Sequence, residues 1–258
     1  MIKLVDVYKS FNGHEVLKGV NLEIPDGKTT AIIGRSGGGK SVLLKHIIGL
    51  LRPDKGQVLV DSTDISRLNN RDLNKIRKRF GILFQGGALF DSLTVYDNIA
   101  FPLREKTRLK ENEIRKMVDE KLEQLGLLGT GYKYPAEISG GMKKRVGLAR
   151  ALIMDPEIML FDEPTTGLDP IMKNAIYNLI SKMHKKFGFT AVVVSHEIPD
   201  IFGIAHYVAM LNNGVIVESG RSTDIQKSTN PVVREFVSEG VVMPNFEIME
   251  EINEEIQY

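Results

Sequence analysis

The chain has 258 residues, of which 34 are basic and 33 acidic, so its net charge is +1; it has no cysteine. This balance argues against a dedicated nucleic-acid binder, which would carry a basic excess. The lack of cysteine excludes disulfides and thiolate metal sites and fits a cytosolic protein. No stretch reaches the roughly 18 continuous apolar residues of a membrane span, and residues 1–11 lack the apolar segment of a signal peptide. We therefore expect any membrane role to come through a partner.

The first predicted elements are strands of an antiparallel sheet. Residues 2–5 and 16–24 have the alternation of strands, and Asn12-Gly13 between them is a strong turn signal. Phe11 lies just before this turn. Taken alone, it is more typical of a core aromatic than of a binding residue.

A glycine-rich loop follows the apolar strand predicted at residues 29–33. It matches G-x-x-x-x-G-K-[ST] at every fixed position and leads into a helix. Its residues are Gly34, Arg35, Ser36, Gly37, Gly38, Gly39, Lys40 and Ser41. Backbone N–H groups of such a loop bind phosphate, Lys40 would reach the β- and γ-phosphates, and the Ser41 hydroxyl would ligate Mg²⁺. A plain glycine turn fits less well because the strand and helix flank the motif, so the sequence predicts a nucleotide phosphate site.

The middle of the chain adds one polar candidate. Residues 69–80 predict a basic, solvated helix, and residues 81–84 predict a buried strand that ends at Gln85. The carboxyl end of a parallel strand is where α/β sheets place ligand chemistry, although a loop glutamine is ordinary by itself. From residue 93 to 124 the pattern is helical, and we expect a break at Pro102.

Ser139 begins a further predicted helix. It is a good N-cap, and Gly140 and Gly141 leave the first N–H groups uncovered. This pattern fits a second anion site and a plain helix start equally well.

Two more buried strands end in polar residues. Residues 158–163 end in Asp162, which can hold Mg²⁺ through water, and in Glu163, which can orient or deprotonate an attacking water. Residues 190–195 are followed by His196. A lone histidine is usually structural, but at this position it could also polarise a γ-phosphate.

The last part of the chain is predicted to contain a hairpin, two short helices and a tail. Strands at 207–211 and 215–218 meet at a tight turn, and helices follow near residue 223 and after Pro231. Residues 246–258 fit either a weakly amphipathic helix or a disordered acidic tail.

Together these motifs resemble the ATP-binding cassette (ABC) ATPases over residues 2–238. They are Gly34–Ser41 (Walker A), Gln85 (Q-loop), Ser139-Gly140-Gly141 (signature), Ile158–Glu163 (Walker B), Leu168-Asp169 (D-loop) and His196 (H-switch). The resemblance implies an α/β P-loop NTPase fold. It has a RecA-like parallel sheet core, an N-terminal antiparallel β subdomain, and a helical subdomain at about 91–154 that carries the signature. The ABC ATPase domain would span 1–238, and 239–258 would be an acidic tail.

The resemblance also implies roles for residues. Glu163, His196 and Gln85 would be catalytic, and Ser41, Gln85 and Asp162 would hold Mg²⁺. Contacts to ATP would come from Phe11 (stacking on adenine), Gly34, Arg35, Ser36, Gly37, Gly38, Gly39, Lys40, Ser41, Val42, Asp162, Ser139, Gly140, Gly141 and Asp169. In this family the signature serves the nucleotide of the other subunit, so two chains would sandwich two ATP molecules.

Two departures point to a subfamily. Met142 replaces the usual signature glutamine, which leaves the backbone donors and Ser139 in place, and Val42 replaces the usual threonine. With the segments around Gln85 and Asp169, these residues look like the Mla/Mce-type ATPases of phospholipid or hydrophobic-compound transport. Such a protein would lie in the cytoplasm, on the inner face of the bacterial inner membrane. Its partners would be a transmembrane permease and a lipid-binding Mce-domain protein, with no nucleic acid, and its tail could contact the neighbouring ATPase or a regulator.

Three alternatives remain: an ABC ATPase for another cargo, a soluble ABC protein outside transport, and a cassette that binds without hydrolysis. The second should show two cassettes, a long coiled-coil insertion or a basic excess, and the third should lack Lys40 or Glu163. The sequence shows no second cassette, coiled-coil insertion or basic excess, and it has both Lys40 and Glu163.

Overall fold

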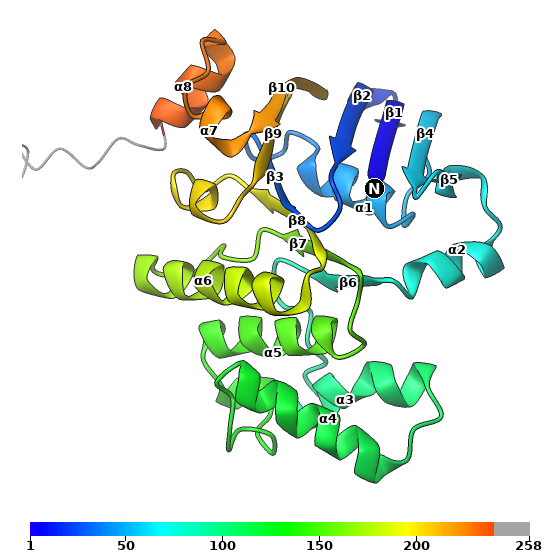
Figure 1. Cartoon of the computed structure of the whole chain (residues 1–258), viewed down its shortest axis with the longest axis vertical. Helices are drawn as coiled ribbons and strands as arrows, with labels where there is room; N and C mark the ends of the chain where they lie inside the picture. Colours follow the sequence, from blue (N-terminus) through cyan, green and yellow to red (C-terminus); the bar gives the residue numbers. More distant parts are fainter. Residues whose placement is uncertain (240–258) are drawn as a thin grey trace, which may run out of the picture.

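The computed structural model describes residues 1–239, and its first sheet is antiparallel (Figure 1). Its strands lie in the order β2-β1-β4-β5. Their bounds are β1 (Ile2–Phe11), β2 (His14–Ile24), β4 (Lys55–Val60) and β5 (Thr63–Asp64). Asn12 and Gly13 join β1 to β2 with φ of 50° and 79°, so the predicted hairpin is confirmed and its first strand is longer than expected.

The second sheet has six strands in the order β10-β9-β3-β8-β7-β6. Strands β9, β3, β8, β7 and β6 are mutually parallel, and β10 pairs antiparallel with β9. Their bounds are β3 (Thr29–Ile33), β6 (Phe80–Leu83), β7 (Ile158–Asp162), β8 (Thr190–Ser195), β9 (Tyr207–Asn212) and β10 (Val215–Arg221). The carboxyl ends of β3, β6, β7 and β8 therefore meet at one edge, which is where the predicted site residues follow.

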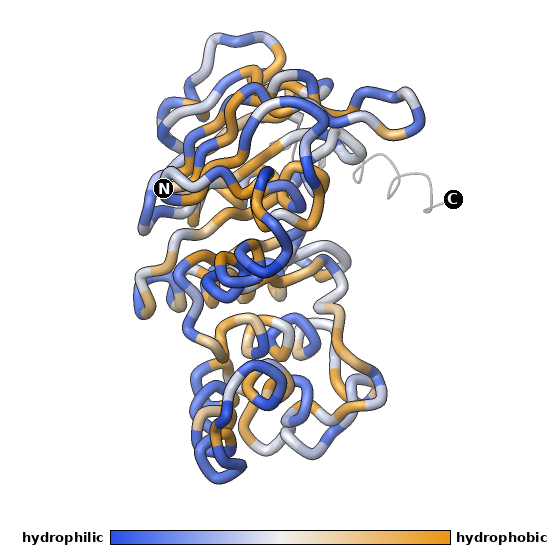
Figure 2. The backbone as a smooth tube through the Cα atoms, turned by 90° about the vertical axis from the view of Figure 1, so that its right-hand side faces the viewer, coloured by the Kyte–Doolittle hydropathy of each residue, from blue (hydrophilic) through white to orange (hydrophobic). Residues whose placement is uncertain are grey.

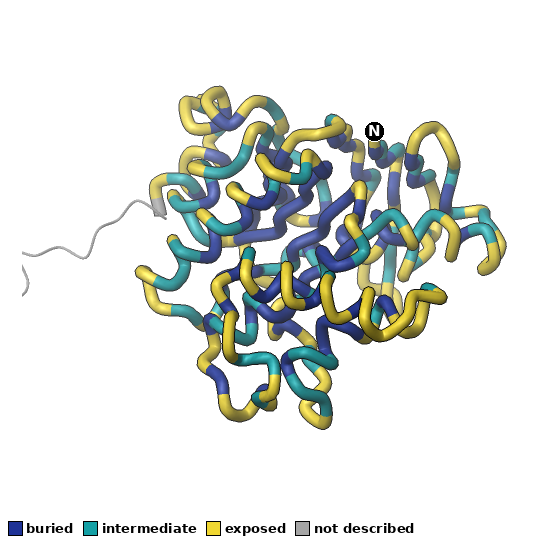
Figure 3. Tube along the Cα trace, turned by 60° about the horizontal axis from the view of Figure 1, so that its bottom comes forward, coloured by how far each residue is buried: buried dark blue, intermediate teal, exposed yellow. Residues whose placement is uncertain are grey.

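Each face of this sheet packs against a different layer. Ile32, Leu160 and Val192 share a buried cluster with helix α1 (Lys40–Ile47) and the first sheet. Phe161 and Val193 belong to a second cluster on the opposite face, which includes residues of α5 and α6. Because neighbouring positions of a strand point to opposite faces, both faces must be apolar. Figure 3 shows these strands buried inside the molecule.

The helical part of the chain consists of α3 (Val95–Lys106), α4 (Glu111–Gln124) and α5 (Gly140–Leu152). Figure 1 shows α3 and α4 at one end of the molecule, and Figure 2 shows polar stretches along their outer turns. Buried residues of all three helices share one cluster with Phe161 of the sheet. The subdomain boundary at about 91–154 stays a prediction, since this part has no core separate from that of the sheet.

Pro102 does not break the helix, so that prediction is wrong. It lies inside α3, which continues to Lys106. Ile99 and Leu103 on either side of it are buried in the core, and this packing offsets the backbone hydrogen bond that proline cannot make. The helix ends instead at Thr107, whose hydroxyl donates to the Leu103 carbonyl at 2.7 Å.

The remaining helices are α2 (Asn70–Arg77), α6 (Pro170–Phe187), α7 (Ser222–Ile225) and α8 (Pro231–Glu239), with 3-10 turns η1 (Ile65–Arg67), η2 (Pro135–Glu137) and η3 (Asp200–Gly203). Helix α2 buries only Leu73, as expected of a solvated helix. Within residues 1–239, no helix has both the length and the apolar character needed to cross a membrane. The predicted tail at 246–258 lies outside the described residues, and the domain boundary at 238 stays a prediction.

Candidate nucleotide site

The glycine loop between β3 and α1 has a shape that other residues could not adopt. Gly39, the N-cap of α1, has φ of 93°, and a Cβ there would lie 3.1 Å from Val16 Cγ1. Gly34 has φ of 152°, and a Cβ there would lie 2.2 Å from the Leu211 carbonyl oxygen. The motif glycines are thus required by backbone conformation and by close packing.

Lys40 is held beneath this loop. Its Nζ donates to the carbonyl oxygens of Gly34 and Arg35, both at 2.9 Å, and lies 3.8 Å from Glu163 Oε1. The residue is 4% exposed. Burial lowers the pKa of Lys40, while the charges of Glu163 and Asp162 oppose that shift. A positive group is therefore fixed next to the loop that would cradle phosphates.

Ser41 and Asp162 meet although they come from α1 and from the end of β7. The Ser41 hydroxyl donates to Asp162 Oδ1 at 2.8 Å. Two oxygen ligands this close suit Mg²⁺, which is usually held by one or two carboxylates together with substrate phosphates. Among residues 1–239, no cluster of three His, Asp or Glu side chains could hold a metal by itself. The pair therefore fits a Mg²⁺ that arrives with a nucleotide.

Glu163 is the centre of the hydrogen bonds at this edge. Its Oε2 accepts from Gln85 Nε2 at 3.3 Å and from the Thr166 hydroxyl at 3.1 Å. Its Oε1 lies 3.2 Å from His196 Nδ1. Its own N–H donates to the Val194 carbonyl at 3.0 Å, and its φ is 47°, an unusual value for a residue other than glycine. Such a backbone persists only where its surroundings fix it, often at active sites.

These elements enclose a cavity of about 370 Å³. It is lined by Val16, Ser36, Gly37, Gly39, Lys40, Ser41, Val42, Gln85 and Glu163. The structure thus brings the residues of the glycine loop together with Gln85 and Glu163, and their contacts add Asp162 and His196.

The predicted signature residues Ser139, Gly140 and Gly141 and the predicted D-loop residue Asp169 do not line this cavity. Ser139 caps α5 and accepts from Met142 N at 3.3 Å, as predicted for an N-cap, and Asp169 caps α6. Both are exposed. A Cβ on Gly140 would lie 3.8 Å from Leu168 Cδ2, so the signature and the D-loop share one surface. Their contact with the nucleotide of a second subunit stays a prediction.

Phe11 is 42% exposed, so its interpretation as a core aromatic is wrong. Lys9 Nζ lies 5.4 Å from the centre of its ring. Phe11 does not line the cavity described above. Its role in stacking on adenine stays a prediction.

Sequence reasoning missed several polar residues behind the site. Thr165, Tyr177 and Glu197 make buried or half-buried hydrogen bonds there. Lys144, on α5, is 6% exposed. Thr165 and Glu197 could have been found from the sequence, because each closely follows a predicted site residue. Lys144 and Tyr177 lie within helices, where nothing in the sequence indicates a role at the site.

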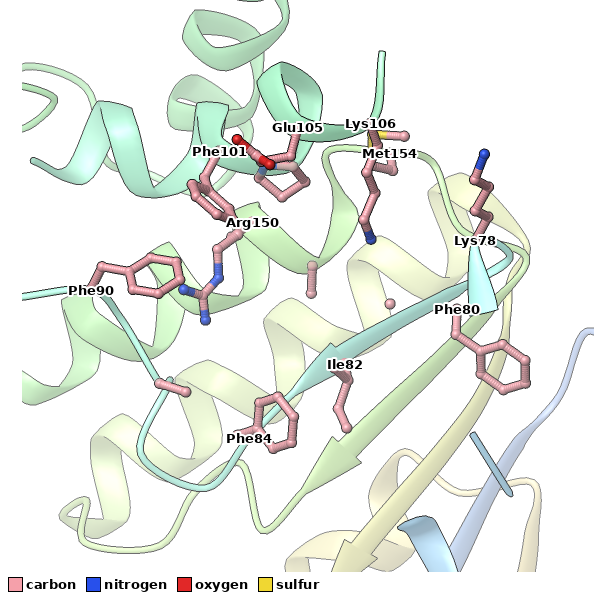
Figure 4. A pocket seen from close by; sticks show the side chains of 14 residues that line it. Lys78, Phe80, Ile82, Phe84, Phe90, Phe101, Glu105, Lys106, Arg150 and Met154 are labelled. Carbon is pink, nitrogen blue, oxygen red and sulfur yellow. The ribbon is translucent and has the colours of Figure 1, made fainter. Parts of the chain in front are cut away.

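A second cavity, of about 320 Å³, is largely apolar and lies between β6, α3 and α5. Phe90 and Phe101 line it with their ring centres 4.9 Å apart, and the Arg150 guanidinium lies 5.6 Å from the Phe90 ring. Figure 4 shows these three side chains gathered on one side, with Ile82 on β6 and Phe84 just after its end. Arg150 also donates to the Gly87 carbonyl at 2.8 Å, which ties this cavity to the loop after Gln85.

The family model of the ABC transporter matches residues 17–166. The chain belongs to the ABC transporter family. It is therefore an ABC-type ATPase that powers a transporter, which agrees with the phosphate loop, Glu163 and His196 meeting at one edge.

Named relatives support the same assignment. The chain is 45% identical over 237 residues to a probable ribonucleotide transport ATP-binding protein, mkl, of Mycobacterium leprae, covering 92% of this chain and 68% of that protein. It is also 45% identical over 218 residues to the intermembrane phospholipid transport system ATP-binding protein MlaF of Haemophilus influenzae, covering 84% of this chain and 83% of MlaF.

A solved relative is the ATP-binding cassette MJ0796, a dimer in a post-hydrolysis state bound to ADP and Pi. The TM-score is 0.79 at 34% identity, covering 86% of this chain and 99% of the other. The P-loop NTPase fold is therefore confirmed, and in this relative two cassettes form a dimer.

Proposed function

We propose that this ABC ATPase powers the transport of phospholipids or related hydrophobic compounds at the bacterial inner membrane, lying on its inner face. The support is the 45% identity with MlaF over 83% of that protein's length, since the name of MlaF gives phospholipid transport. The mycobacterial relative, whose name gives ribonucleotide transport, is covered to a smaller extent, 68%. The proposal includes a permease and a lipid-binding Mce-domain protein as further subunits.

The chemistry proposed for the site is hydrolysis of the γ-phosphate of ATP. Lys40 and the loop N–H groups bind the phosphates, and Glu163 orients and deprotonates the attacking water. Gln85 and His196 keep the Glu163 carboxylate in place through contacts of 3.3 Å and 3.2 Å. The observation that carries this proposal is the position of Glu163, with Lys40, Gln85 and His196 around it.

Mg²⁺ is proposed as the metal that accompanies ATP. Ser41, Asp162 and Gln85 would hold it, since a hydroxyl, a carboxylate and an amide each supply an oxygen ligand, and the Ser41 hydroxyl lies 2.8 Å from Asp162 Oδ1. When bound, the ion neutralises negative charge on the β- and γ-phosphates. The signature residues Ser139, Gly140 and Gly141, with Asp169, would contact the nucleotide of the other subunit.

The cargo is tested on the assembled transporter, purified with its membrane subunits and analysed for bound lipid. ATP turnover is then measured in vesicles of phosphatidylethanolamine and phosphatidylglycerol, and separately in detergent with added ribonucleoside monophosphates. We expect phospholipid to co-purify and turnover to rise with the vesicles. A rise with the ribonucleotides alone, and no bound phospholipid, would contradict the lipid proposal.

The apolar cavity beside Phe90 and Phe101 is proposed as the contact for the permease. It adjoins the loop after Gln85, and Phe90 and Phe101 are exposed, which is costly for large apolar side chains without a partner. Phe101→Glu should lose the permease when the complex is purified through a tag on this chain. The control is Tyr132→Glu, at an exposed aromatic of another cavity, which should retain it. Equal recovery of the permease with both variants would rule out this contact.

A further inference from the structure

Four residues form a closed ring of hydrogen bonds directly behind Glu163 and His196, made by their side chains and by one backbone N–H. The Thr165 hydroxyl lies 2.8 Å from Glu197 Oε2 and 3.1 Å from the Tyr177 hydroxyl. The Tyr177 hydroxyl lies 3.1 Å from Ser195 Oγ. Ser195 Oγ in turn accepts from the backbone N–H of Glu197 at 3.0 Å. The ring therefore starts and ends at Glu197.

Elementary chemistry gives these bonds one direction. An ionised carboxylate only accepts, so the single proton of the Thr165 hydroxyl goes to Glu197. The Thr165 oxygen then accepts from Tyr177, and the Tyr177 oxygen accepts from Ser195. Every hydroxyl donates once and accepts once, an arrangement in which hydrogen bonds strengthen one another. Burial raises the pKa of Tyr177, which keeps its hydroxyl protonated as a donor.

The ring is buried, and its one charged member, Glu197, is paired with a lysine. Thr165, Tyr177 and Ser195 are buried, and Glu197 is nearly so. Lys173 Nζ lies 2.8 Å from Glu197 Oε1 and compensates the carboxylate that burial would otherwise penalise. Lys173 and Tyr177 are four residues apart on α6, so they project from one face of that helix. Helix α6 thus holds the ring at two points.

The members of the ring flank the reacting groups along the chain. Ser195 and Glu197 are the residues directly before and after His196, and Thr165 follows Glu163 by two positions. Glu163 is also joined to the end of β8 through the Val194 carbonyl at 3.0 Å. A shift of the ring would therefore move His196 relative to Glu163, whose contact is 3.2 Å.

We propose that Thr165, Tyr177, Ser195 and Glu197 are positioning residues that set the contact of His196 with Glu163 during ATP hydrolysis. This inference rests on the proposed role of Glu163 and His196. The ring touches neither nucleotide-loop residue Lys40 nor Ser41, so it should influence turnover and leave ATP binding in place.

The main test removes one hydroxyl at a time in the full chain within its transporter. Tyr177→Phe keeps the aromatic ring, and Thr165→Val keeps the shape of the side chain. Each should lower kcat roughly tenfold, with little change in KM for ATP. This is less than the roughly 100-fold loss of rate that a misplacement of about 1 Å can cause. Thr165→Ser restores the hydroxyl and should keep most of the turnover. Tyr207→Phe, at a half-buried tyrosine of β9, is the matched control and should behave as the unaltered protein.

A second measurement separates positioning from loss of stability. His196→Ala is combined with Tyr177→Phe, and all assays run well below the unfolding temperature of each variant. If the ring acts through His196, Tyr177→Phe should reduce kcat no further in the His196→Ala background. An equal further loss in both backgrounds, or an unchanged kcat in Tyr177→Phe and Thr165→Val, would overturn the inference. Glu163→Gln is measured alongside. If it keeps full turnover, the proposed role of Glu163 is wrong. If Glu163→Gln loses turnover and the ring variants do not, only the positioning role of the ring is wrong.

Discussion

The Nδ1 atom of His196 lies 3.2 Å from Oε1 of Glu163, although 33 residues separate them in sequence. The contact exists because β7 and β8 are parallel neighbours, with Asp162 paired to Val194, so both strands end at the same level of the sheet. Since an ionised carboxylate only accepts, His196 Nδ1 is the donor. This contact links the residue proposed to activate water with the one that would sense the γ-phosphate.

Lys40→Ala should weaken ATP binding by about 10- to 100-fold, the range for losing charge-assisted hydrogen bonds. The reason is that Lys40 Nζ is buried and fixed by two loop carbonyls at 2.9 Å. Titration of the purified chain with a fluorescent ATP analogue measures this. Lys45→Ala, at an exposed position of the same helix, should keep the affinity of the unaltered protein. A normal affinity for Lys40→Ala would remove the glycine loop from the binding site.

Ser139→Arg should block dimerisation that depends on ATP and leave nucleotide binding intact. Ser139 is exposed at the start of α5 and does not line the cavity of its own chain. A bulky charge there would meet the partner's nucleotide. Light scattering with ATP measures the dimer, and Thr223→Arg on α7, which Figure 1 places far from α5, is the control. A normal dimer of Ser139→Arg would argue against the shared site.

Lys144→Met should leave the free energy of unfolding unchanged or raise it by about 1 kcal/mol at neutral pH. Lys144 Nζ is buried and has no hydrogen-bond partner within residues 1–239. Removing the Lys144 charge leaves each nearby carboxylate with another lysine. Glu163 still has Lys40 at 3.8 Å, and Glu197 still has Lys173 at 2.8 Å. Urea denaturation measures the difference, with Lys143→Met as the control. A loss of more than about 1 kcal/mol would contradict this prediction and show that Lys144 stabilises the fold.

The same variant should also alter how stability depends on pH. Burial lowers the pKa of Lys144, against the opposing charges of Glu163 and Glu197. Between this lowered pKa and the unfolded value near 10.5, the unfolded chain binds more protons, so stability from this group rises with pH. The advantage of Lys144→Met should therefore shrink as pH rises through this window. An advantage that grows with pH would contradict the sign of the shift.

The sequence predicted those parts of the fold and site whose signal is local. The glycines of Gly34–Ser41 and the acids that end β7 are such signals, because each motif carries its own conformation and chemistry. Pro102 was misjudged because the burial of Ile99 and Leu103, which sustains α3, is a tertiary effect. Tyr177 could not be assigned for the same reason: its partners Thr165 and Ser195 come from other elements.

The measurement that tests the central claim most directly is ATP turnover of Glu163→Gln in the assembled transporter, with ATP binding measured on the same sample. Glutamine keeps the shape of the side chain and cannot accept the proton of the attacking water. The account predicts that ATP still binds with near-normal affinity and that turnover falls by about 10²–10⁴-fold. Steady-state hydrolysis at the rate of the unaltered protein would contradict it.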